Sequence, residues 1–436
     1  MAEPVTEIRD ETIEYFASPP EFFRKRRSQG SVIPSVLFGA PCYFLVGPKA
    51  HEFVHVSGRH LFSSAQAYRR VIESFGHGAI IAQDGEAWKI QHDIITPLFS
   101  PASLNRMFDI KKKLYADRMA QWPGEGTVDL LQESIMLAIR GSLRAMFGLD
   151  IDPVVNEVRD CLITFGEIAF MTFGMAETEA RVKETHRKLE QILGPQIDAK
   201  RRNPGEDGMS YYATKYNPPL SNAEILQHAA GLMFAAHDTT KSMMTWSFYL
   251  MLHYPEYRAR VMQEVAEKVG PELTFTPVSL PNKLPMLDNL IKEAERMYTP
   301  LHPNSRVVME DFEFEGHHIP KGAIVQVDAF AVHYDPAIFY DPERFDPDRF
   351  APPREEHKHS PYALFGFGGG ERVCMGKPVA RQDIKTALIL ALQNYELELV
   401  DQGELEIAWG PMTQPKNGLK VFVRPKESEG QRGTGA

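Results

Sequence analysis

Apolar side chains recur every three to four residues through most of the chain, which is the spacing of one buried face on an α-helix. The helices predicted from this spacing span Glu21–Gln29, Ser103–Trp122, Val128–Phe147, Val154–Phe173, Glu177–Arg202, Pro285–Tyr298 and Lys377–Leu392. Short runs rich in β-branched and aromatic residues predict strands at Ser31–Leu37, Cys42–Val46 and Arg306–Met309. The mixed segment Ser63–Gln83 is expected to be a long loop. The chain is therefore expected to be mostly α-helical, with a small β-rich lobe.

A longer helix that ends at Tyr254 is predicted to start after Ser221, which forms a capping-box pattern with the glutamate three residues on. At about 50 Å it would cross the whole molecule. Its middle carries the polar pair Asp238 and Thr239 within an otherwise apolar face. Such a pair is unfavourable inside a helix unless it is satisfied or used. Hydrogen bonding of the threonine to the preceding turn is expected to open the helix and leave a groove, which Ala235–Ala236 keep clear.

Composition limits the class of protein. The chain has 436 residues, of which 43% are hydrophobic and 24% charged, and this suits a globular protein with a large core. No internal repeat, low-complexity block or firm boundary occurs, so we expect one domain over residues 1–436 with a frayed polar tail from residue 426. The net charge of −10 argues against a nucleic-acid binder.

The cysteines and the N-terminus indicate the cellular compartment of the protein. Cys42, Cys161 and Cys374 are too few and too scattered for a disulfide framework or a cysteine zinc site, which fits a reducing cytoplasm. The first ten residues are polar and acidic, with neither a signal peptide nor a hydrophobic anchor. No run reaches the roughly 18 apolar residues that a spanning helix needs. A cytoplasmic protein without a membrane anchor is therefore expected.

A glycine-rich loop over residues 367–376 closes on Cys374. The cysteine lies just before the predicted helix Lys377–Leu392, so a thiolate there would lie near the positive end of the helix dipole, among free backbone N–H groups. The glycines remove side chains where a flat, bulky group would approach the backbone. These conditions suit a sulfur ligand to haem iron. The other interpretations are an inert buried cysteine and a phosphate loop, whose glycine spacing this run lacks.

The pattern Phe-x-x-Gly-x-Arg-x-Cys-x-Gly, from Phe367 to Gly376, resembles the haem-binding loop of the cytochrome P-450 superfamily. Chance would place these residue types at this spacing in about 5 of 100,000 chains of this composition. Three further motifs of that family occur in order along the chain: the acid–alcohol pair Asp238–Thr239 of the oxygen-activation motif, Glu293-x-x-Arg296, and Phe-x-Pro-x-Arg-Phe at Phe345–Phe350.

The resemblance implies a P-450 fold in which haem b lies between the long central helix and the cysteine-loop helix, with Cys374 as the axial ligand of the iron. The other loop residues that it places at the haem are Phe367, Gly368, Arg372 and Gly376. Haem propionates would be bound by Trp88, His92 and Arg306. Trp88 and His92 lie one turn apart on a helix that begins at Asp84. The family usually has arginine where this chain has His92. The Glu-x-x-Arg and Phe-x-Pro-x-Arg-Phe motifs would hold the scaffold of the loop.

By the same resemblance the protein is a haem-dependent monooxygenase that inserts one atom of dioxygen into a C–H or C=C bond of a lipophilic small molecule. Thr239 and Asp238 are the predicted catalytic residues, the alcohol relaying hydrogen bonds and the acid linking it to solvent. Their presence favours a monooxygenase over a haem-thiolate isomerase or peroxygenase and over a non-catalytic haem carrier. The apolar stretch Cys161–Met175 is either plain core or the pliable roof of the pocket.

The implied electron donor is a separate ferredoxin-type or flavin protein, because the chain has neither a flavin motif nor a cluster-binding set of cysteines. Lys111–Lys113, Lys377 and Arg381 are either a basic docking patch for it or scattered surface charges. The chain resembles the soluble, mostly bacterial members of the family, and a monomer is expected.

A competing motif occurs near the N-terminus. The run His51-Glu52-Phe53-Val54-His55 has the spacing of a zinc peptidase, which on a helix would place two histidines on one face. Such a pattern arises by chance in about 4 of 100 chains of this composition. His60 also falls one position short of the third-ligand spacing. A zinc hydrolase through His51 and His55 is therefore an alternative hypothesis, and a surface helix is the simpler one.

Overall fold

The computed structural model describes residues 8–170, 175–269, 284–410 and 412–426. Its α-helices are α1 (Thr12–Ala17), α2 (Pro19–Arg26), α3 (Pro48–Glu52), α4 (Ser64–Ala67), α5 (Arg69–Phe75), α6 (Gly85–Ile95), α7 (Pro101–Met119), α8 (Leu130–Gly141), α9 (Val155–Phe170), α10 (Met175–Arg202), α11 (Gly208–Thr214), α12 (Asn222–His253), α13 (Pro255–Lys268), α15 (Pro285–Met297), α16 (Ala329–His333) and α17 (Lys377–Asn394). Its strands are β1 (Val32–Leu37), β2 (Ala40–Leu45), β3 (Phe62–Ser63), β4 (Gly126–Asp129), β5 (Pro303–Val308), β6 (Phe312–Phe314), β7 (His317–Ile319), β8 (Ile324–Asp328), β9 (Tyr395–Leu399), β10 (Ile407–Ala408), β11 (Gln414–Pro415) and β12 (Lys420–Pro425). The predicted class, mostly helical with little strand, is confirmed.

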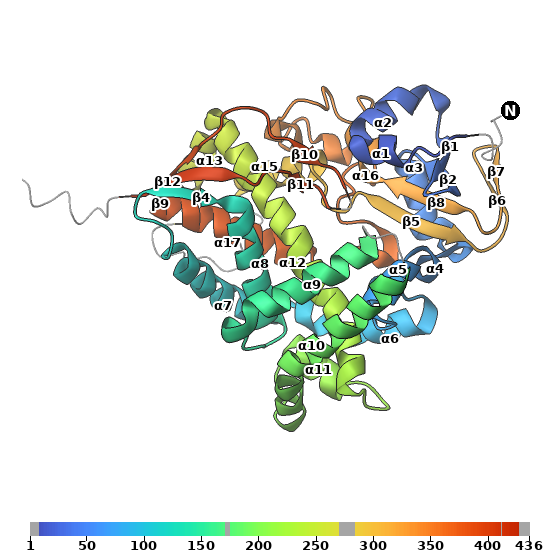
Figure 1. Ribbon diagram of the computed structural model, residues 1–436. Helices are drawn as coiled ribbons and strands as arrows, with labels where there is room; N and C mark the ends of the chain where they lie inside the picture. The colour runs from blue at the N-terminus through green and yellow to red at the C-terminus, as the bar shows by residue number, and fades with distance from the viewer. Residues whose placement is uncertain (1–7, 171–174, 270–283, 411, 427–436) are drawn as a thin grey trace, which may run out of the picture.

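The β-rich lobe lies to one side of the helices. Its main sheet has the order β1-β2-β8-β5-β3, in which only β2 and β8 run parallel. Figure 1 shows this sheet at the upper right, next to α1, α2 and α3. A second, antiparallel sheet of order β4-β12-β9 lies at the opposite end of the molecule. The two remaining strand pairs, β6-β7 and β10-β11, are short and antiparallel.

The long helix α12 connects the two largest hydrophobic clusters and crosses the middle of the molecule (Figure 1). Its first half places Met233 and Phe234 in a cluster with α5, α9, α10 and α11. Its second half places Trp246 in a cluster with α7, α15 and α17. The capping box between Ser221 and Glu224 is present, as the sequence predicts. Because both halves of α12 place side chains in these clusters, its central residues are held in a fixed position for the site.

Two predictions of local structure are wrong. The segment Ser63–Gln83 contains α4 and α5 rather than one long loop. The hydroxyl of Ser63 accepts the backbone N–H of Gln66 (3.1 Å) and so caps α4, which is too short to show a helical period. The helix predicted from Val128 begins only at Leu130, because Val128 pairs with a residue of β12 far along the chain.

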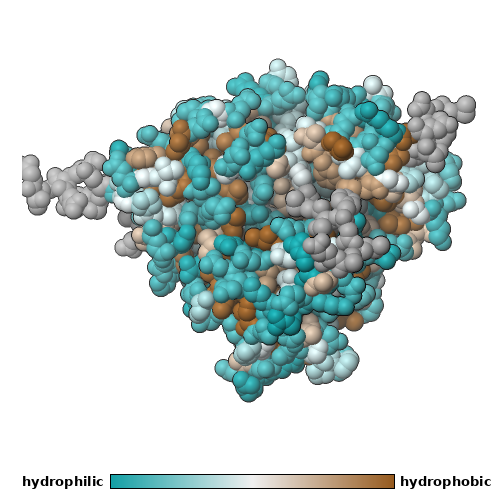
Figure 2. All heavy atoms as spheres, in the orientation of Figure 1, coloured by the Kyte–Doolittle hydropathy of each residue, from teal (hydrophilic) through white to brown (hydrophobic). Residues whose placement is uncertain are grey.

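Hydrophilic residues cover most of the face shown in Figure 2, with apolar residues scattered among them. None of the described helices combines the length and apolar composition that a membrane crossing requires. Residues 171–174 of the predicted apolar roof and 427–436 of the predicted tail lie outside the described residues.

Candidate functional site

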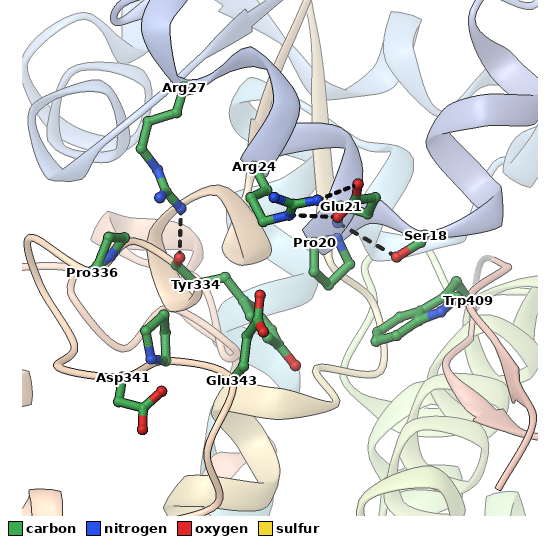
Figure 3. A pocket seen from close by; sticks show the side chains of 11 residues that line it. Ser18, Pro20, Glu21, Arg24, Arg27, Tyr334, Pro336, Asp341, Glu343 and Trp409 are labelled. Carbon is green, nitrogen blue, oxygen red and sulfur yellow. Dashed lines mark hydrogen bonds and ion pairs between the residues drawn. The ribbon is translucent and has the colours of Figure 1, made fainter. Parts of the chain in front are cut away.

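Two cavities of similar size differ in chemistry. The first, of ≈ 350 Å³, lies between α2 and the chain after α16 (Figure 3). Three of its charged side chains already have partners: Arg24 forms a two-point ion pair with Glu21 (2.6 Å), and Arg27 donates to the carbonyl oxygen of Tyr334 (2.7 Å). The second, of ≈ 320 Å³, is lined by every predicted site residue except Asp238. The second cavity, hereafter the central cavity, is therefore the candidate site.

Cys374 enters the central cavity from a loop that its own backbone holds in shape. Its N–H donates to the carbonyl oxygen of Phe367 (2.9 Å), and its carbonyl oxygen accepts the N–H of Lys377 (3.3 Å) at the start of α17. The side chain is exposed into the cavity. Burial within the surrounding protein raises the pKa of the Cys374 thiol, while the N–H groups of Gly376 and Lys377 lower it. A metal cation at the sulfur would add to these N–H groups and favour the thiolate.

Two glycines shape the surface beside Cys374. Gly368 and Gly370 have φ values of +70° and +63°, a conformation that other residues rarely adopt. A Cβ on Gly370 would overlap the carbonyl oxygen of His55, so the loop packs directly against the chain that follows α3. On the cavity side the loop has no side chain at Gly368 and Gly376, which fits the approach of a flat group such as haem.

Four side chains that bear N–H groups line the cavity close to one another: Trp88, His92, Arg306 and Arg372. The ring centroids of Trp88 and His92 are 4.8 Å apart, and the guanidinium of Arg372 lies 4.8 Å from the Trp88 ring. Burial lowers the pKa of Arg372, and the positive charge of Arg306 lowers it further. Two neighbouring cations in a cavity wall are stabilised when an anion lies between them. The group therefore fits the carboxylates of a haem.

Asp84 is a residue that the sequence analysis missed. Its carboxylate accepts from Arg372 Nη2 (3.0 Å), from Ser63 Oγ (2.6 Å) and from the backbone N–H groups of Ser64 and Ala65 (3.1 and 3.0 Å). Asp84 therefore orients Arg372 and fixes α4 beside the cavity. Its place just before α6 indicates a helix cap, but its side chain is used for these other contacts instead.

The acid and the alcohol on α12 lie at different depths. Thr239 lines the cavity with Ala235 and Ala236, and its hydroxyl donates to the carbonyl oxygen of Ala235 (2.8 Å). The helix continues unbroken through this point, so the expected opening is wrong. Asp238 lies outside the cavity lining and forms an ion pair with Lys241 (2.5 Å). Lys241 was missed, although its i, i+3 spacing from Asp238 is visible in the sequence.

The cavity wall at Pro300 and Leu301 is fixed by Thr413, a fully buried residue. The N–H of Thr413 donates to the carbonyl oxygen of Pro300 (3.1 Å), and its hydroxyl donates to that of Thr299 (3.0 Å). Its own carbonyl oxygen accepts from Trp246 Nε1 of α12 (3.2 Å). These contacts tie the segment after α15 and the helix α12, both of which line the cavity, to Thr413.

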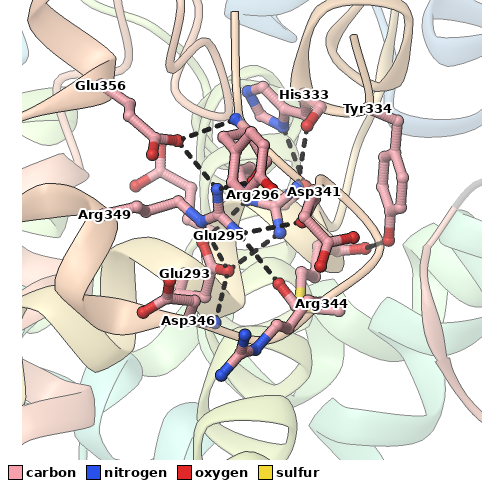
Figure 4. Close-up of polar contacts among 12 residues, drawn as sticks. Glu293, Glu295, Arg296, His333, Tyr334, Asp341, Arg344, Asp346, Arg349 and Glu356 are labelled. Carbon is pink, nitrogen blue, oxygen red and sulfur yellow. Dashed lines mark hydrogen bonds and ion pairs between the residues drawn. The ribbon is translucent and has the colours of Figure 1, made fainter. Parts of the chain in front are cut away.

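Glu293, Arg296 and Arg349 form a fully buried network away from the cavity lining (Figure 4). Glu293 accepts two bonds from Arg296 (2.8 and 2.9 Å), one from Arg349 Nε (3.0 Å) and one from the N–H of Asp346 (3.0 Å). Arg296 also donates to the carbonyl oxygen of His333 (2.8 Å). Because both carboxylate oxygens are bonded, the network suits the scaffold role expected from the sequence.

The histidines of the zinc motif are buried, so the expected surface helix is wrong. Their rings are stacked with centroids 6.4 Å apart, and both pack against Phe365. Burial lowers the pKa of His51 and lowers that of His55 to about 4. No group of three or more potential ligands to a metal occurs in the described part of the chain. The arrangement therefore favours a packing role for His51 and His55 over a zinc site.

The predicted basic patch does not form as expected. Lys111 is buried and donates to both carboxylate oxygens of Asp383 at 2.8 Å. Arg381 pairs with Glu295 (3.1 Å) beneath the cysteine loop. Lys111 therefore does not contribute to a docking surface, and the charge of Arg381, whose side chain is 20% exposed, is paired with a carboxylate of α15.

The chain matches known proteins over nearly all of its length. The sequence profile of the family described as "Cytochrome P450" matches residues 14–422. "Abscisic acid 8'-hydroxylase 1" of Oryza sativa subsp. japonica is 27% identical, over 96% of this chain and 89% of the relative. "Putative cytochrome P450 120" of Synechocystis is also 27% identical, over 93% and 92%. The solved structure described as "Retinoic acid bound cyanobacterial CYP120A1" matches with a TM-score of 0.83 at 26% identity, over 95% of this chain and 96% of that one.

Proposed function

The chain belongs to the cytochrome P450 family and is a haem-dependent monooxygenase of that family, and from this premise we propose that Cys374 is the sulfur ligand of the haem iron. The observation that carries this proposal is the exposure of the Cys374 side chain within the central cavity, which α12 also lines. The glycine-rich loop beside it fits the flat face of a haem. The groups proposed to hold the haem carboxylates are Trp88, His92, Arg306 and Arg372.

We propose haem b, which is held without covalent attachment, because the three cysteines of the chain form no Cys-x-x-Cys-His pattern. When bound, the haem supplies the reductive activation of dioxygen and the transfer of one oxygen atom to the substrate. The protein's part is to direct the N–H groups of Gly376 and Lys377 at the Cys374 sulfur, where they lower the pKa of the thiol against the larger raising effect of burial. Phe367 and Gly368, which also line the cavity, form the rest of the proposed haem contact.

Thr239 and Asp238 are the proposed proton path. The hydroxyl of Thr239 gives its hydrogen to the carbonyl oxygen of Ala235, which leaves the oxygen lone pairs free to accept a hydrogen bond from the cavity. Asp238 and Lys241 form an ion pair whose side chains are 8% and 12% exposed. Because this pair is slightly exposed and the neighbouring Thr239 lines the cavity, we propose that protons pass from the pair to Thr239.

We propose a lipophilic small molecule as the substrate, oxidised by hydroxylation or epoxidation. The apolar residues of the cavity wall support this class: Ile80, Ile81, Leu232, Met243 and Leu301. One relative is named for abscisic acid and the matched structure for bound retinoic acid, and both names are those of carboxylic acids. A panel of these two acids and their neutral esters, scored by the low-to-high-spin Soret shift, would test the class. A shift with none of the four compounds would argue against substrates of this kind.

We further propose a monomer that receives electrons from a separate ferredoxin or flavin protein. The sequence contains neither a flavin motif nor a set of cysteines for an iron–sulfur cluster, which supports a separate donor. All three cysteines are free thiols, which supports a reducing compartment such as the cytoplasm. Sedimentation of the holoprotein and reduction by purified ferredoxin or flavin reductases would test these points.

The test of the haem-thiolate proposal is the ferrous–CO spectrum of the purified, haem-loaded protein. We expect the red-shifted Soret band that marks a thiolate ligand. Haem bound without this band would overturn the assignment of Cys374.

A peroxygenase or isomerase is the second candidate function. The cavity position of Thr239 and the neighbouring Asp238 favours the monooxygenase. Turnover that depends on dioxygen and reduced nicotinamide would support it, whereas product formed only with added hydrogen peroxide would favour the peroxygenase.

A further inference from the structure

A buried carboxylate in the wall of the central cavity takes no part in the assignments above. Glu295 of α15 is 1% exposed and lines the cavity. Its Oε2 accepts from Arg381 Nη2 (3.1 Å), while its Oε1 is buried without a hydrogen-bond partner among the described residues. Burying an anion with one oxygen unpaired is costly. Its position therefore calls for a physical explanation.

The explanation is not that α15 is poorly packed. Glu293, two residues earlier, has both oxygens bonded within its network. Residues at i and i+2 of a helix point in different directions, and Glu295 faces the cysteine loop and α17 instead. The unpaired oxygen belongs to the face of α15 that meets the cavity.

Glu295 and Arg381 together enclose the start of the cysteine loop. A Cβ on Gly366 would lie 2.5 Å from Cγ of Glu295, so the glutamate packs directly on the residue before Phe367. The guanidinium of Arg381 lies 5.9 Å from the centre of the Phe367 ring. Arg381 reaches Glu295 from α17, the helix that begins just after Cys374.

The charge of Glu295 also acts on the sulfur. Glu295 and Cys374 line the same cavity, and Arg381, the partner of Glu295, comes from the helix that begins just after Cys374. A carboxylate that is 1% exposed is screened weakly by solvent. It therefore disfavours a second negative charge nearby and favours positive charge.

We propose that Glu295, held by Arg381, is a positioning residue that fixes the start of the cysteine loop and sets the electrostatic field at Cys374. The inference rests on the proposed role of Cys374 as the iron ligand. The ferric haem has one more positive charge than the ferrous haem, so the anion of Glu295 stabilises the ferric state and the cation of Arg381 opposes it.

The test is the reduction potential of the haem in Glu295→Gln and Arg381→Gln, measured by redox titration of the holoprotein. In Glu295→Gln the positive charge of Arg381 loses its nearer carboxylate partner and keeps the more distant Asp288 (3.8 Å). We expect the reduction equilibrium to move about tenfold toward the ferrous form, which is about 59 mV for a one-electron couple. In Arg381→Gln we expect a shift of similar size toward the ferric form, and the double variant should lie near the wild type.

Opposite signs separate this role from a purely structural one, because loss of packing alone would not move the two potentials in opposite directions. Asp288→Asn is the matched control. Asp288 lies 3.8 Å from Arg381 in the same ionic cluster but outside the cavity lining, and a shift below threefold is expected. If Glu295→Gln fails to fold, the direction of the potential shift in Arg381→Gln still tests the inference. That variant should fold, because the side chain of Arg381 is 20% exposed.

Shifts in the same direction, or shifts below twofold in both single variants, would overturn the inference. The ferrous–CO band of the wild type keeps this outcome apart from failure of the proposed function. A missing band removes the thiolate assignment itself. A normal band together with unchanged reduction potentials would refute only the proposed role of Glu295 and Arg381.

Discussion

The two faces of α15 place similar side chains in opposite circumstances. On one face Glu293 meets Arg296 and Arg349 with both carboxylate oxygens bonded and no exposure. On the other face Glu295 has an unpaired oxygen in the cavity wall, on the side of the cysteine loop. The difference in hydrogen bonding distinguishes structural carboxylates from those that can act on a bound group. A buried network with its oxygens satisfied is a scaffold, and a buried carboxylate that lines a cavity with one oxygen unpaired is a candidate for interaction with a bound group.

The largest expected effect comes from the cavity side. Cys374→Ser should abolish oxygenation and the red-shifted ferrous–CO band, because the hydroxyl of serine does not supply a thiolate to the iron. Circular dichroism should remain near that of the wild type, since the loop is held by backbone bonds from Phe367 and Lys377. As a control, Cys161→Ser changes a cysteine far from the cavity lining and should leave the band in place. Retained product with the serine variant would contradict the assignment.

On the scaffold side the expected effect is on stability. Glu293→Gln leaves Arg296 buried without the carboxylate that it pairs with, while Arg349 keeps its ion pair with Glu356, and the loss should cost about 3–5 kcal/mol in the free energy of unfolding. The measurement is urea unfolding followed by circular dichroism. Glu179→Gln removes a carboxylate from an exposed ion pair with Lys183 and should cost less than about 0.5 kcal/mol. Equal losses of unfolding free energy in the two variants would show that the buried network contributes no more to stability than an exposed ion pair.

A smaller effect is expected at the alcohol of α12. Thr239→Ala should lower the product formed per reduced nicotinamide consumed on the order of tenfold, less than the full range for proton transfer because water can enter the cavity instead. Thr245→Ala is the matched control: its hydroxyl donates to the carbonyl oxygen four residues earlier in the same way (2.7 Å), but it does not line the cavity. Unchanged coupling in Thr239→Ala would count against the proton path.

The β-rich lobe should lose stability in mild acid. Burial lowers the pKa of His55 to about 4, while an unfolded histidine binds its proton near pH 6.5. Below pH 6.5 the unfolded chain therefore binds more protons than the folded one, so stability falls as the pH falls toward about 4. The slope is about 1.4 kcal/mol per pH unit for each such histidine. His55→Gln should reduce the slope of unfolding free energy between pH 7 and 5, and exposed His318→Gln should not.

The parts of the fold that the sequence predicts well are those with local signals. The capping box before α12 and the pattern of the cysteine loop involve residues close in the chain, so they can be recognised without the fold. The helices α4 and α5 and the strand β4 could not be predicted in this way. In β4, Val128 pairs with β12, and at the start of α4 the side chain of Ser63 is fixed by Asp84. Their structure depends on partners that only the folded chain brings together.

The same limit applies to the site. The loop and the acid–alcohol pair were found because they are contiguous motifs. Glu295, Asp84 and Lys241 were missed, since a single charged residue in a sequence is most often a solvated one. Lys111 and Arg381 were read as surface charges for the same reason, and the structure buries the first and pairs both with carboxylates.

The smallest expected effect concerns His92, where the family resemblance expects arginine. His92 lines the cavity beside Trp88, and its side chain is 27% exposed. An arginine there would remain charged at all pH values and form a charge-assisted bond to a haem carboxylate. This adds about 1 kcal/mol over a neutral donor, so haem should transfer to an excess of apomyoglobin about fivefold more slowly at pH 8. Lys89→Arg, at an exposed residue of the same helix paired with Asp93, should leave the rate unchanged. A His92→Arg variant that loses haem faster would place the carboxylates elsewhere in the cavity and weaken the grouping of Trp88, His92 and Arg372.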